Sequence, residues 1–245
     1  MPRIVRASAF LLLTATALAE TPPVPPRKPE TTRPATVDPP HPPRHERIGP
    51  ETIPVAPPAN PGALCLAALQ REGHAVEPAE APKASESACT LDTPVRISAI
   101  RTATGTVQLP DRPLLSCAFA ADVVDFVQDL AAPLAQAVLG SSLAKLGTGP
   151  GYNCRTRNRV PGAKISAHGQ GRAIDIATLE TAARKSIAVS ARLTGVDAAY
   201  VSALRKAACG WFNTTLGPGS DPAHADHLHF DDEPRGRDGQ SRFCQ

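Results

Sequence analysis

Proline is concentrated in one segment near the N-terminus, and this concentration limits where a folded domain can lie. Residues 20–61 contain 15 of the 27 prolines, five basic and five acidic residues, and few side chains that can pack into a core. Proline fixes φ and favours extended polyproline II, so this segment is expected to be a disordered linker. It can be a spacer, a docking strand for a partner, or a leader without a specific ligand. The folded domain is expected in residues 62–245.

The residues before the linker have the organisation of an export signal. Residues 1–6 carry two arginines, residues 7–17 are mostly apolar, and Ala17-Leu18-Ala19 is a small-x-small cleavage sequence. We therefore expect residues 1–19 to be a signal peptide and the mature protein to be periplasmic or secreted. The apolar run is too short to span a bilayer. No second long apolar segment follows, so the mature chain is expected to have no membrane span.

All six cysteines follow the linker. They are Cys65, Cys89, Cys117, Cys154, Cys209 and Cys244. An even number of cysteines in an exported chain predicts three disulfides. A thiolate zinc site is the alternative, but the chain lacks the Cys-x-x-Cys pairs of zinc fingers and ribbons. Fifteen pairings are possible for six cysteines, and the expected one joins neighbours: Cys65 to Cys89, Cys117 to Cys154, and Cys209 to Cys244.

The segment after the linker is long enough for one core, and its patterns mix helices with short strands. Helices are expected at residues 62–73, 116–129, 133–144 and 194–209. Strands are expected at residues 95–100, 106–109, 163–165, 173–177, 186–190 and 227–230. Repeated strand–helix units are absent from this order. The sequence therefore predicts a single α+β domain with a small antiparallel sheet, flanked by helices and stabilised by disulfides.

Two short segments of this domain contain ligands suited to a metal ion. Residues 166–175 include His168 and Asp175, and residues 226–229 read Asp-His-Leu-His. Zinc binds imidazole nitrogen and carboxylate oxygen, and a catalytic site needs only three protein ligands. Side chains in a strand repeat every two residues, so Asp175 shares a face with two small alanines, and His227 shares a face with His229. The two segments together predict a metal site on the sheet.

The other histidines have different surroundings. His41 and His45 lie in the proline-rich segment, and His74 follows a glycine in a predicted turn. Solvated loop positions are expected for these three. His224 is interpreted as an exposed loop residue or a contact to substrate, because three ligands already complete a catalytic site.

The spacing of these residues resembles a known group of enzymes. Ser-x-His-x-x-Gly-x-Ala-x-Asp at 166–175, with Asp-x-x-His at 226–229, is similar to the zinc peptidases of the lysostaphin, D-Ala-D-Ala carboxypeptidase and hedgehog superfamily. A closer resemblance is to the bacterial extensin-like C-terminal domain. It is carried by Tyr152-x-Cys154-Arg155, Leu216-Gly217-Pro218-Gly219, the stretch 226–231 and Arg242-Phe243-Cys244. The resemblance covers residues 63–245.

This resemblance implies a role for each matching position. His168, Asp175 and His229 correspond to the ligands of Zn²⁺. Carboxypeptidase-like relatives place the base at the position of Asp226, and lysostaphin-like relatives place it at His227. We favour Asp226 as the proton carrier, with His227 hydrogen-bonding the oxyanion or the water. A carboxylate that only orients a histidine ligand is the alternative for Asp226.

Two further positions and the substrate follow from the same resemblance. Arg155 matches an arginine that meets a substrate carboxylate or carbonyl, although a surface arginine beside a disulfide is the alternative. Ser166 is expected to support the site by hydrogen bonding. The implied activity is a zinc-dependent hydrolase of peptidoglycan stem peptides or cross-links, of D,D- or L,D-type.

Composition narrows the other classes of function. The net charge is only +3 and no basic cluster is interleaved with aromatic residues, so nucleic acid is not an expected partner. The alternative to an enzyme is a non-catalytic zinc-containing module that binds the cell wall. A zinc carrier would need a longer histidine-rich loop than the chain has. Peptidoglycan peptides are the expected partner, and a monomer is expected.

Overall fold

A computed structural model describes residues 61–239 and 241–245 of the chain. The predicted signal peptide, the predicted linker up to residue 60, His41 and His45 lie outside the described residues. Four α-helices are described, with the bounds α1 Pro61–Arg71, α2 Cys117–Phe126, α3 Ala132–Leu139 and α4 Gly195–Ala208. Their ends differ by one or two residues from those of the four predicted helical segments, except that α2 and α3 end earlier than predicted. None of the described helices is long and apolar enough to cross a membrane.

The described strands form one sheet. Their bounds are β1 Ala75–Pro78, β2 Pro94–Thr102, β3 Gly105–Gln108, β4 Leu114–Ser116, β5 Leu143–Thr148, β6 Ala173–Thr181, β7 Ser186–Ala188, β8 Thr214–Leu216, β9 Leu228–Asp231 and β10 Phe243–Cys244. The order is β1-β2-β3-β5-β6-β9-β8-β10, with β4 paired to β2 and β7 paired to β6. Most pairs are antiparallel, and β3–β5 and β10–β8 are parallel. The α+β class is confirmed, and the sheet is larger than the sequence predicts.

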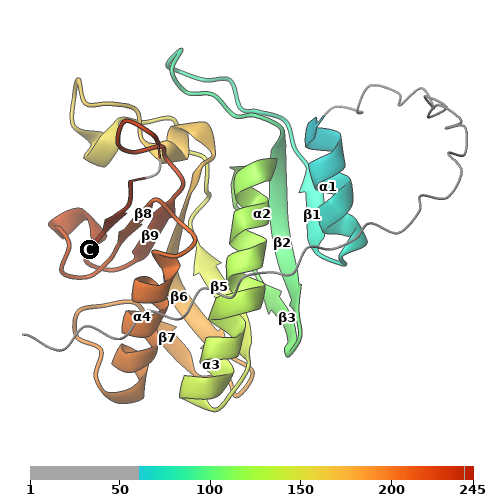
Figure 1. The fold of residues 1–245 in the computed structure, drawn as a ribbon, viewed down its shortest axis with the longest axis vertical. Coiled ribbons are helices and arrows are strands. Elements are labelled where there is room, and N and C mark those ends of the chain that lie inside the picture. Colours follow the sequence, from blue (N-terminus) through green and yellow to red (C-terminus); the bar gives the residue numbers. More distant parts are fainter. Residues whose placement is uncertain (1–60, 240) are drawn as a thin grey trace, which may run out of the picture. The chain divides into compact units, whose positions relative to one another are not determined.

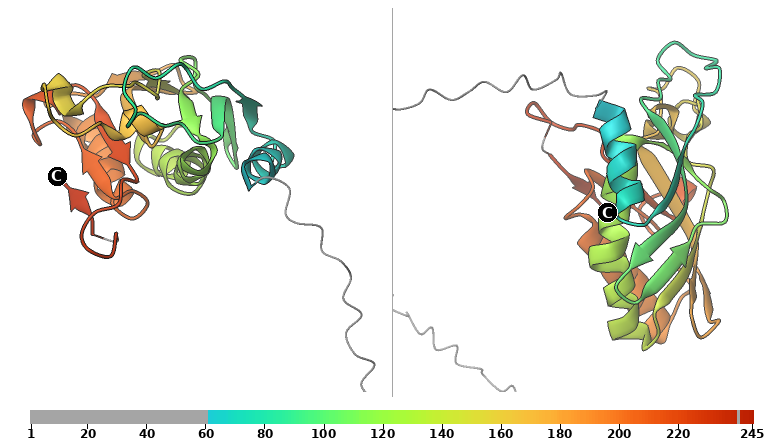
Figure 2. Two further views of the ribbon diagram at one scale, coloured as in Figure 1. Left: turned by 90° about the horizontal axis from the view of Figure 1, so that it is seen from above. Right: turned by 90° about the vertical axis from the view of Figure 1, so that its right-hand side faces the viewer.

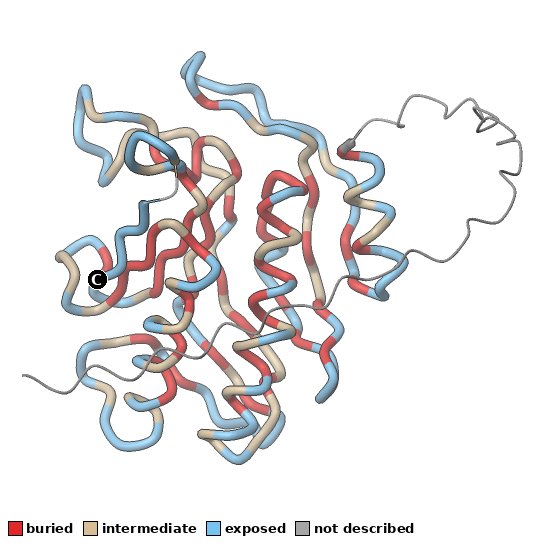
Figure 3. Tube along the Cα trace, viewed as in Figure 1, coloured by how far each residue is buried: buried red, intermediate tan, exposed pale blue. Residues whose placement is uncertain are grey.

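The helices gather on one face of this sheet (Figures 1 and 2). The core forms between the sheet and the helices, and the buried chain runs through the central strands and α2 in Figure 3. Ile174 and Ile176 of β6 and Phe230 of β9 belong to this core. Because side chains alternate along a strand, Asp175 and His229 face the side of the sheet away from the helices. The candidate metal ligands therefore lie on the face of the sheet opposite the α-helices.

The chain stays helical between the second and third helices, where the sequence predicts a gap. A π-helical segment, Val127–Ala131, joins α2 to α3. The sequence predicts a new helix from Pro133 to residue 144, but α3 already ends at Leu139, where Gly140 adopts a left-handed φ of 68°. Glycine adopts this conformation without a Cβ penalty, which makes it a common helix terminator. The chain then enters β5.

The disulfides correct two of the three predicted pairings. Cys65 is joined to Cys117, Cys89 to Cys154, and Cys209 to Cys244. Only the last pair joins neighbours in the sequence. The packing of α1 beside α2 places Cys65 against Cys117, and this tertiary contact has no local signal in the sequence. No free cysteine is present among the described residues. Three disulfides are typical of proteins that fold outside the reducing cytosol.

Two other predictions are wrong in detail. Residues 163–165 do not form a strand, and only Ile165 makes an isolated bridge, with Thr156. His74 was expected in a solvated loop, but it is only 5 % exposed. Its Nδ1 accepts a hydrogen bond from the backbone amide of Arg101 in β2. The Gly-His pair does lie in a turn, but the turn folds its imidazole inward.

Candidate metal centre

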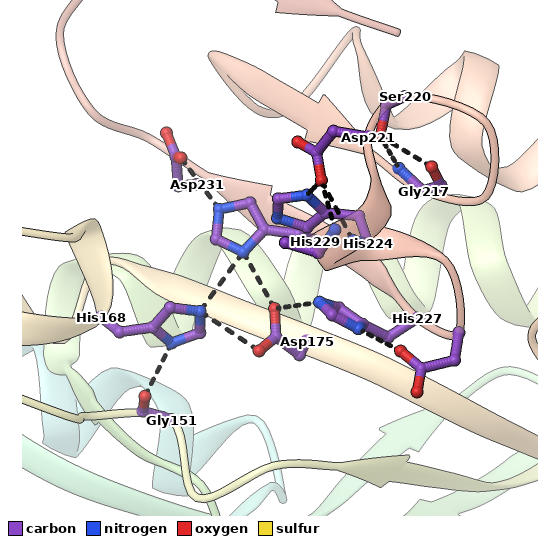
Figure 4. Close-up of polar contacts among 12 residues, drawn as sticks. Gly151, His168, Asp175, Gly217, Ser220, Asp221, His224, His227, His229 and Asp231 are labelled. Atoms are coloured by element: carbon purple, nitrogen blue, oxygen red, sulfur yellow. Dashed lines mark hydrogen bonds and ion pairs between the residues drawn. The ribbon is translucent and has the colours of Figure 1, made fainter. Parts of the chain in front are cut away.

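Three side chains converge where β6 pairs with β9, on the face of the sheet opposite the α-helices (Figure 4). His168 Nε2 lies 3.3 Å from His229 Nδ1 and 3.2 Å from an oxygen of Asp175. His229 Nδ1 lies 2.9 Å from the other Asp175 oxygen. Each residue offers one ligand atom, and all three atoms lie within 4.8 Å of one another. The sequence predicted this grouping of His168, Asp175 and His229, and the structure confirms that they lie together.

The local fold explains how these residues meet. Asp175 of β6 is directly opposite His229 of β9 in the antiparallel register, which places their side chains on the same face. His168 comes from a 3₁₀ turn, Ala167–Gln170, that ends at Gly171. Gly171 has a φ of 63°, and an added Cβ would lie 2.8 Å from the Ser116 amide nitrogen. The glycine of the motif is therefore required for the turn that presents His168.

Both imidazoles are oriented from behind by an oxygen acceptor. His168 Nδ1 donates to the carbonyl oxygen of Gly151 at 2.8 Å, which leaves Nε2 free to act as a ligand. His229 Nε2 donates to Asp231 at 3.0 Å, which directs Nδ1 toward the cluster. Histidine ligands in metal sites usually donate their other ring N–H to a carboxylate or a carbonyl in this way. The cluster therefore has the supporting hydrogen bonds of a metal site.

Charge within the cluster is balanced between histidines and carboxylates. Burial alone would raise the pKa of Asp175, but the hydrogen bonds from His168 and His229 outweigh it and hold this pKa well below its usual range. Burial alone would lower the pKa of His229, but its hydrogen bonds to Asp175 and Asp231 raise it to about 9. Without a metal ion, Asp175 and Asp231 therefore favour the positively charged imidazolium form of His229. A bound cation would replace that proton.

The donor set fits a divalent metal ion. Two imidazole nitrogens and one carboxylate oxygen suit zinc and other borderline transition metals. His168 and His229 are 3 % and 7 % exposed, whereas Asp175 is partly exposed. A metal held by these three residues would therefore be open to the cleft on one side.

The two residues before the last ligand form a hydrogen-bonded pair. Asp226 Oδ1 accepts a hydrogen bond from His227 Nδ1 at 2.9 Å. His227 Nε2 lies 3.6 Å from Asp175 Oδ1, so this nitrogen faces the cluster. The Asp226 side chain is 87 % exposed and does not line the cleft. Of the two candidate bases, His227 is thus the one that faces the cluster directly.

His224 is a further residue of the cleft. The sequence left two alternatives for it, an exposed loop residue or a contact to substrate, and it is only 9 % exposed and lines the cleft. Its Nδ1 donates to Asp221 at 2.7 Å, and its ring centre lies 5.2 Å from that of His227 and 5.4 Å from that of His229. Burial lowers the pKa of His224, although Asp221 acts to raise it. The alternative of an exposed loop histidine is therefore wrong, and a contact to substrate stays a prediction.

The cluster opens into a cleft of about 530 Å³, which is within the size range of small-ligand sites. Arg155 is half-buried in its wall and directly follows Cys154 of the Cys89–Cys154 disulfide, and its contact to substrate stays a prediction. Burial lowers the pKa of Arg155, while the charge of nearby Asp175 raises it. Ser166 is buried at the cleft, where its backbone amide donates to the Arg155 carbonyl and its own carbonyl accepts from Gly169.

Three supporting residues were not predicted from the sequence: Gly151, Asp221 and Asp231. Asp231 could have been found, because it follows His229 by two residues and so shares its face of the strand. Asp221 and Gly151 carry no comparable signal. Their contacts depend on loops that fold over the sheet from other parts of the chain.

Comparison with known proteins gives one match that covers most of the chain. Curated proteins show no significant match, and solved structures show none either. Residues 63–245 match the family described as Extensin-like protein C-terminus. This match includes every residue of the metal cluster and all six cysteines. Because it spans well over half of the sequence, the chain belongs to the extensin-like protein C-terminus family.

Proposed function

We propose that this protein is an exported zinc metallopeptidase that cleaves peptide bonds in peptidoglycan stem peptides or cross-links. We further propose that it belongs to the lysostaphin and D-Ala-D-Ala carboxypeptidase superfamily. The observation that carries this proposal is the convergence of His168, Asp175 and His229 at an open cleft. Three protein ligands with one open position are typical of catalytic zinc, whereas structural zinc usually has four. The motif resemblance and the predicted export support peptidoglycan as the substrate.

Bound Zn²⁺ would supply a Lewis acid that polarises the scissile carbonyl and makes a nearby water more acidic. The protein's own groups would hold and move the protons. His227 Nε2 faces the cluster, so it can accept a proton from the attacking water and return it to the leaving amine. Asp226 accepts the Nδ1–H of His227 and thereby keeps the Nε2 lone pair available.

This assignment differs from the one favoured in the sequence analysis. The resemblance to carboxypeptidase-like relatives favours Asp226 as the base, but its carboxylate is largely exposed and bonded to His227. A general base must lie within hydrogen-bond reach of the proton that it takes, directly or through one water. We therefore propose His227 as the base and Asp226 as the residue that orients it.

Two other residues would contribute to substrate binding. His224 donates from Nδ1 to Asp221, so its Nε2 remains available for the substrate or for a water in the cleft. Arg155 has a permanent positive charge and a planar set of donors, which suits a carbonyl or carboxylate oxygen. Its position near Asp175 places it beside the metal centre.

The test is release of peptides from isolated peptidoglycan by the purified mature protein, with and without a chelator. Zinc-loaded parent protein should release muropeptides that mass spectrometry identifies, and chelation should stop the release. His227→Ala should retain zinc but lose turnover by about 10²–10⁴-fold, the usual contribution of general acid–base catalysis. Asp226→Asn should lose less, because the asparagine oxygen can still accept from His227 Nδ1.

The control measurements are zinc content and retention on insoluble peptidoglycan for each variant. If zinc-loaded parent protein binds walls of several stem chemistries and releases nothing, the non-catalytic wall-binding module replaces the hydrolase. If Asp226→Asn loses more turnover than His227→Ala at equal zinc content, the proton carrier is Asp226 after all.

A further inference from the structure

Several arginines line one side of the cleft, and they differ in how they are neutralised. Arg157 forms an ion pair with Glu233. Arg235 donates to Thr214 and lies over the Phe243 ring, 5.3 Å from its centre. Arg155 donates to the Thr156 carbonyl, at 3.4 Å. Within residues 61–239 and 241–245, neither Arg155 nor Arg159 forms an ion pair with a carboxylate.

A buried carboxylate fixes the loop of residues 157–164, which carries Arg157 and Arg159. Glu233 is 8 % exposed, and its two oxygens pair with Arg157 and Lys164, at the start and end of the loop. The Glu233 amide donates to Asp231, which also orients the metal ligand His229. The loop is therefore tied to the strand that carries the metal centre.

The backbone of the loop adopts an uncommon conformation at its tip. Asn158 and Arg159 have φ values of 50° and 59°, in the left-handed region that residues with side chains rarely occupy. Two consecutive residues of this kind persist only where surrounding contacts hold them, and such strain is concentrated at binding and active sites. The amides of Arg159 and Val160 donate to carbonyls of Thr156 and Arg157 and close the turn. Arg159, at this tip, is exposed and lines the cleft.

The two unpaired arginines lie close enough to affect each other. Burial lowers the pKa of Arg155, Asp175 raises it, and the positive charge of Arg159 lowers it further. The carboxylate of Asp175 is already hydrogen-bonded to the two histidines of the cluster. Among the described residues, neither guanidinium therefore has a carboxylate within ion-pair distance, although carboxylates also line the cleft. A ligand anion would supply such a partner, because guanidinium groups bind carboxylates in a planar, bidentate way.

We propose that Arg159 is a specificity residue that, together with Arg155, binds the free terminal carboxylate of a peptide substrate. The peptide nature of this ligand rests on the proposed function. A carboxylate beside the metal centre would belong to the residue directly after the cleaved bond, which for a short peptide is the chain end. The site then selects for removal of a terminal residue over cleavage within a cross-link. Glu233 acts as a positioning residue for the loop.

A binding experiment tests this inference without relying on turnover. The probes are N-acetyl-D-alanyl-D-alanine and its C-terminal amide, which differ only in the terminal charge. Isothermal titration of the mature, chelator-treated protein gives the ratio of the two affinities. The parent should bind the acid at least about tenfold more tightly than the amide, as expected for charge-assisted hydrogen bonds at a partly exposed site. Arg159→Gln should lose most of that ratio.

Two variants complete the design. Arg192→Gln, an exposed arginine outside the cleft, is the matched control and should keep the ratio of the parent. Glu233→Gln should reduce the ratio with Arg159 still present, because the loop is released. An unchanged ratio in Arg159→Gln, or no preference for the acid in the parent, overturns the inference. If the inference fails in this way, muropeptide release by the zinc-loaded protein would still support the proposed peptidase function. Conversely, a preference for the acid without any muropeptide release would contradict the peptidase function and leave the carboxylate site standing.

Discussion

Replacing Asp231 with asparagine tests whether the cluster is a metal site with supporting hydrogen bonds. Asp231 is 5 % exposed and accepts from His229 Nε2 at 3.0 Å, and it also accepts from the Glu233 amide. Asparagine keeps the volume and one acceptor oxygen but removes the negative charge. The change should therefore leave the fold intact and weaken the orientation and basicity of His229 as a ligand.

The expected size of the effect follows from the hydrogen bond that is weakened. A hydrogen bond to a charged group contributes about 1.5–3 kcal/mol and a neutral one about 1 kcal/mol. A difference of about 1.4 kcal/mol corresponds to a tenfold change in the dissociation constant for the metal. Asp231 also stabilises the proton that competes with zinc for His229, so removing its charge weakens this competitor and offsets part of any larger loss of zinc affinity. We therefore expect zinc to bind about tenfold more weakly to Asp231→Asn.

Competition with a chromophoric chelator at one fixed pH measures this affinity. Asp221→Asn is the matched control, since Asp221 makes a similar contact, at 2.7 Å, to His224 outside the three-residue cluster. Its zinc affinity should remain that of the parent. Near-ultraviolet circular dichroism and thermal unfolding check that both variants are folded. An Asp231→Asn protein that is folded and binds zinc within about twofold of the parent would refute the argument that Asp231 supports the ligand His229.

Three further predictions concern the fold around the site. A residue with a Cβ in the left-handed conformation costs about 1–2 kcal/mol. Gly171→Ala should lower the free energy of unfolding by more than this, because the new Cβ would also lie 2.8 Å from the Ser116 amide nitrogen. Gly162→Ala, with a φ of 75° and nothing within 4 Å, should lose only that conformational term, and equal losses in denaturant titrations would contradict the steric argument. Burial, together with the negative charges of Asp232 and Asp125, raises the pKa of Asp122 to about 6. The folded state therefore holds the carboxyl proton more tightly than the unfolded chain, and the free energy of unfolding falls as the pH rises from about 4 through about 6. Asp122→Asn should therefore be more stable than the parent by about 1 kcal/mol at pH 7.5, after allowance for partial exposure, and equally stable near pH 3.5; a stability difference that does not change with pH would contradict this. Proteolysis without reduction should give linked peptides for Cys65–Cys117, Cys89–Cys154 and Cys209–Cys244, and a peptide linking Cys65 to Cys89 would contradict the structure.

Local patterns in the sequence are enough to predict several elements of this protein. The predicted helix at 194–209 corresponds to α4, and the predicted strand at 173–177 is the start of β6. These elements follow from the spacing of apolar residues over one or two turns or along one strand face. The ligands were predictable for a related reason, because zinc chemistry restricts them to a few residue types and the chain places those types in two short segments.

Contacts between distant segments decided the rest. The antiparallel register of β6 with β9 sets Asp175 opposite His229, and the same strand brings Asp231 behind the imidazole. The folding of the loop before β9 buries His224 and leaves the Asp226 carboxylate in solvent. Disulfide pairing likewise depends on which helices and loops pack together, since six cysteines allow fifteen arrangements. Residue types and local periodicity therefore specify the candidate ligands and most helices, whereas long-range packing decides which side chains face the metal centre, because that choice depends on segments more than fifty residues apart.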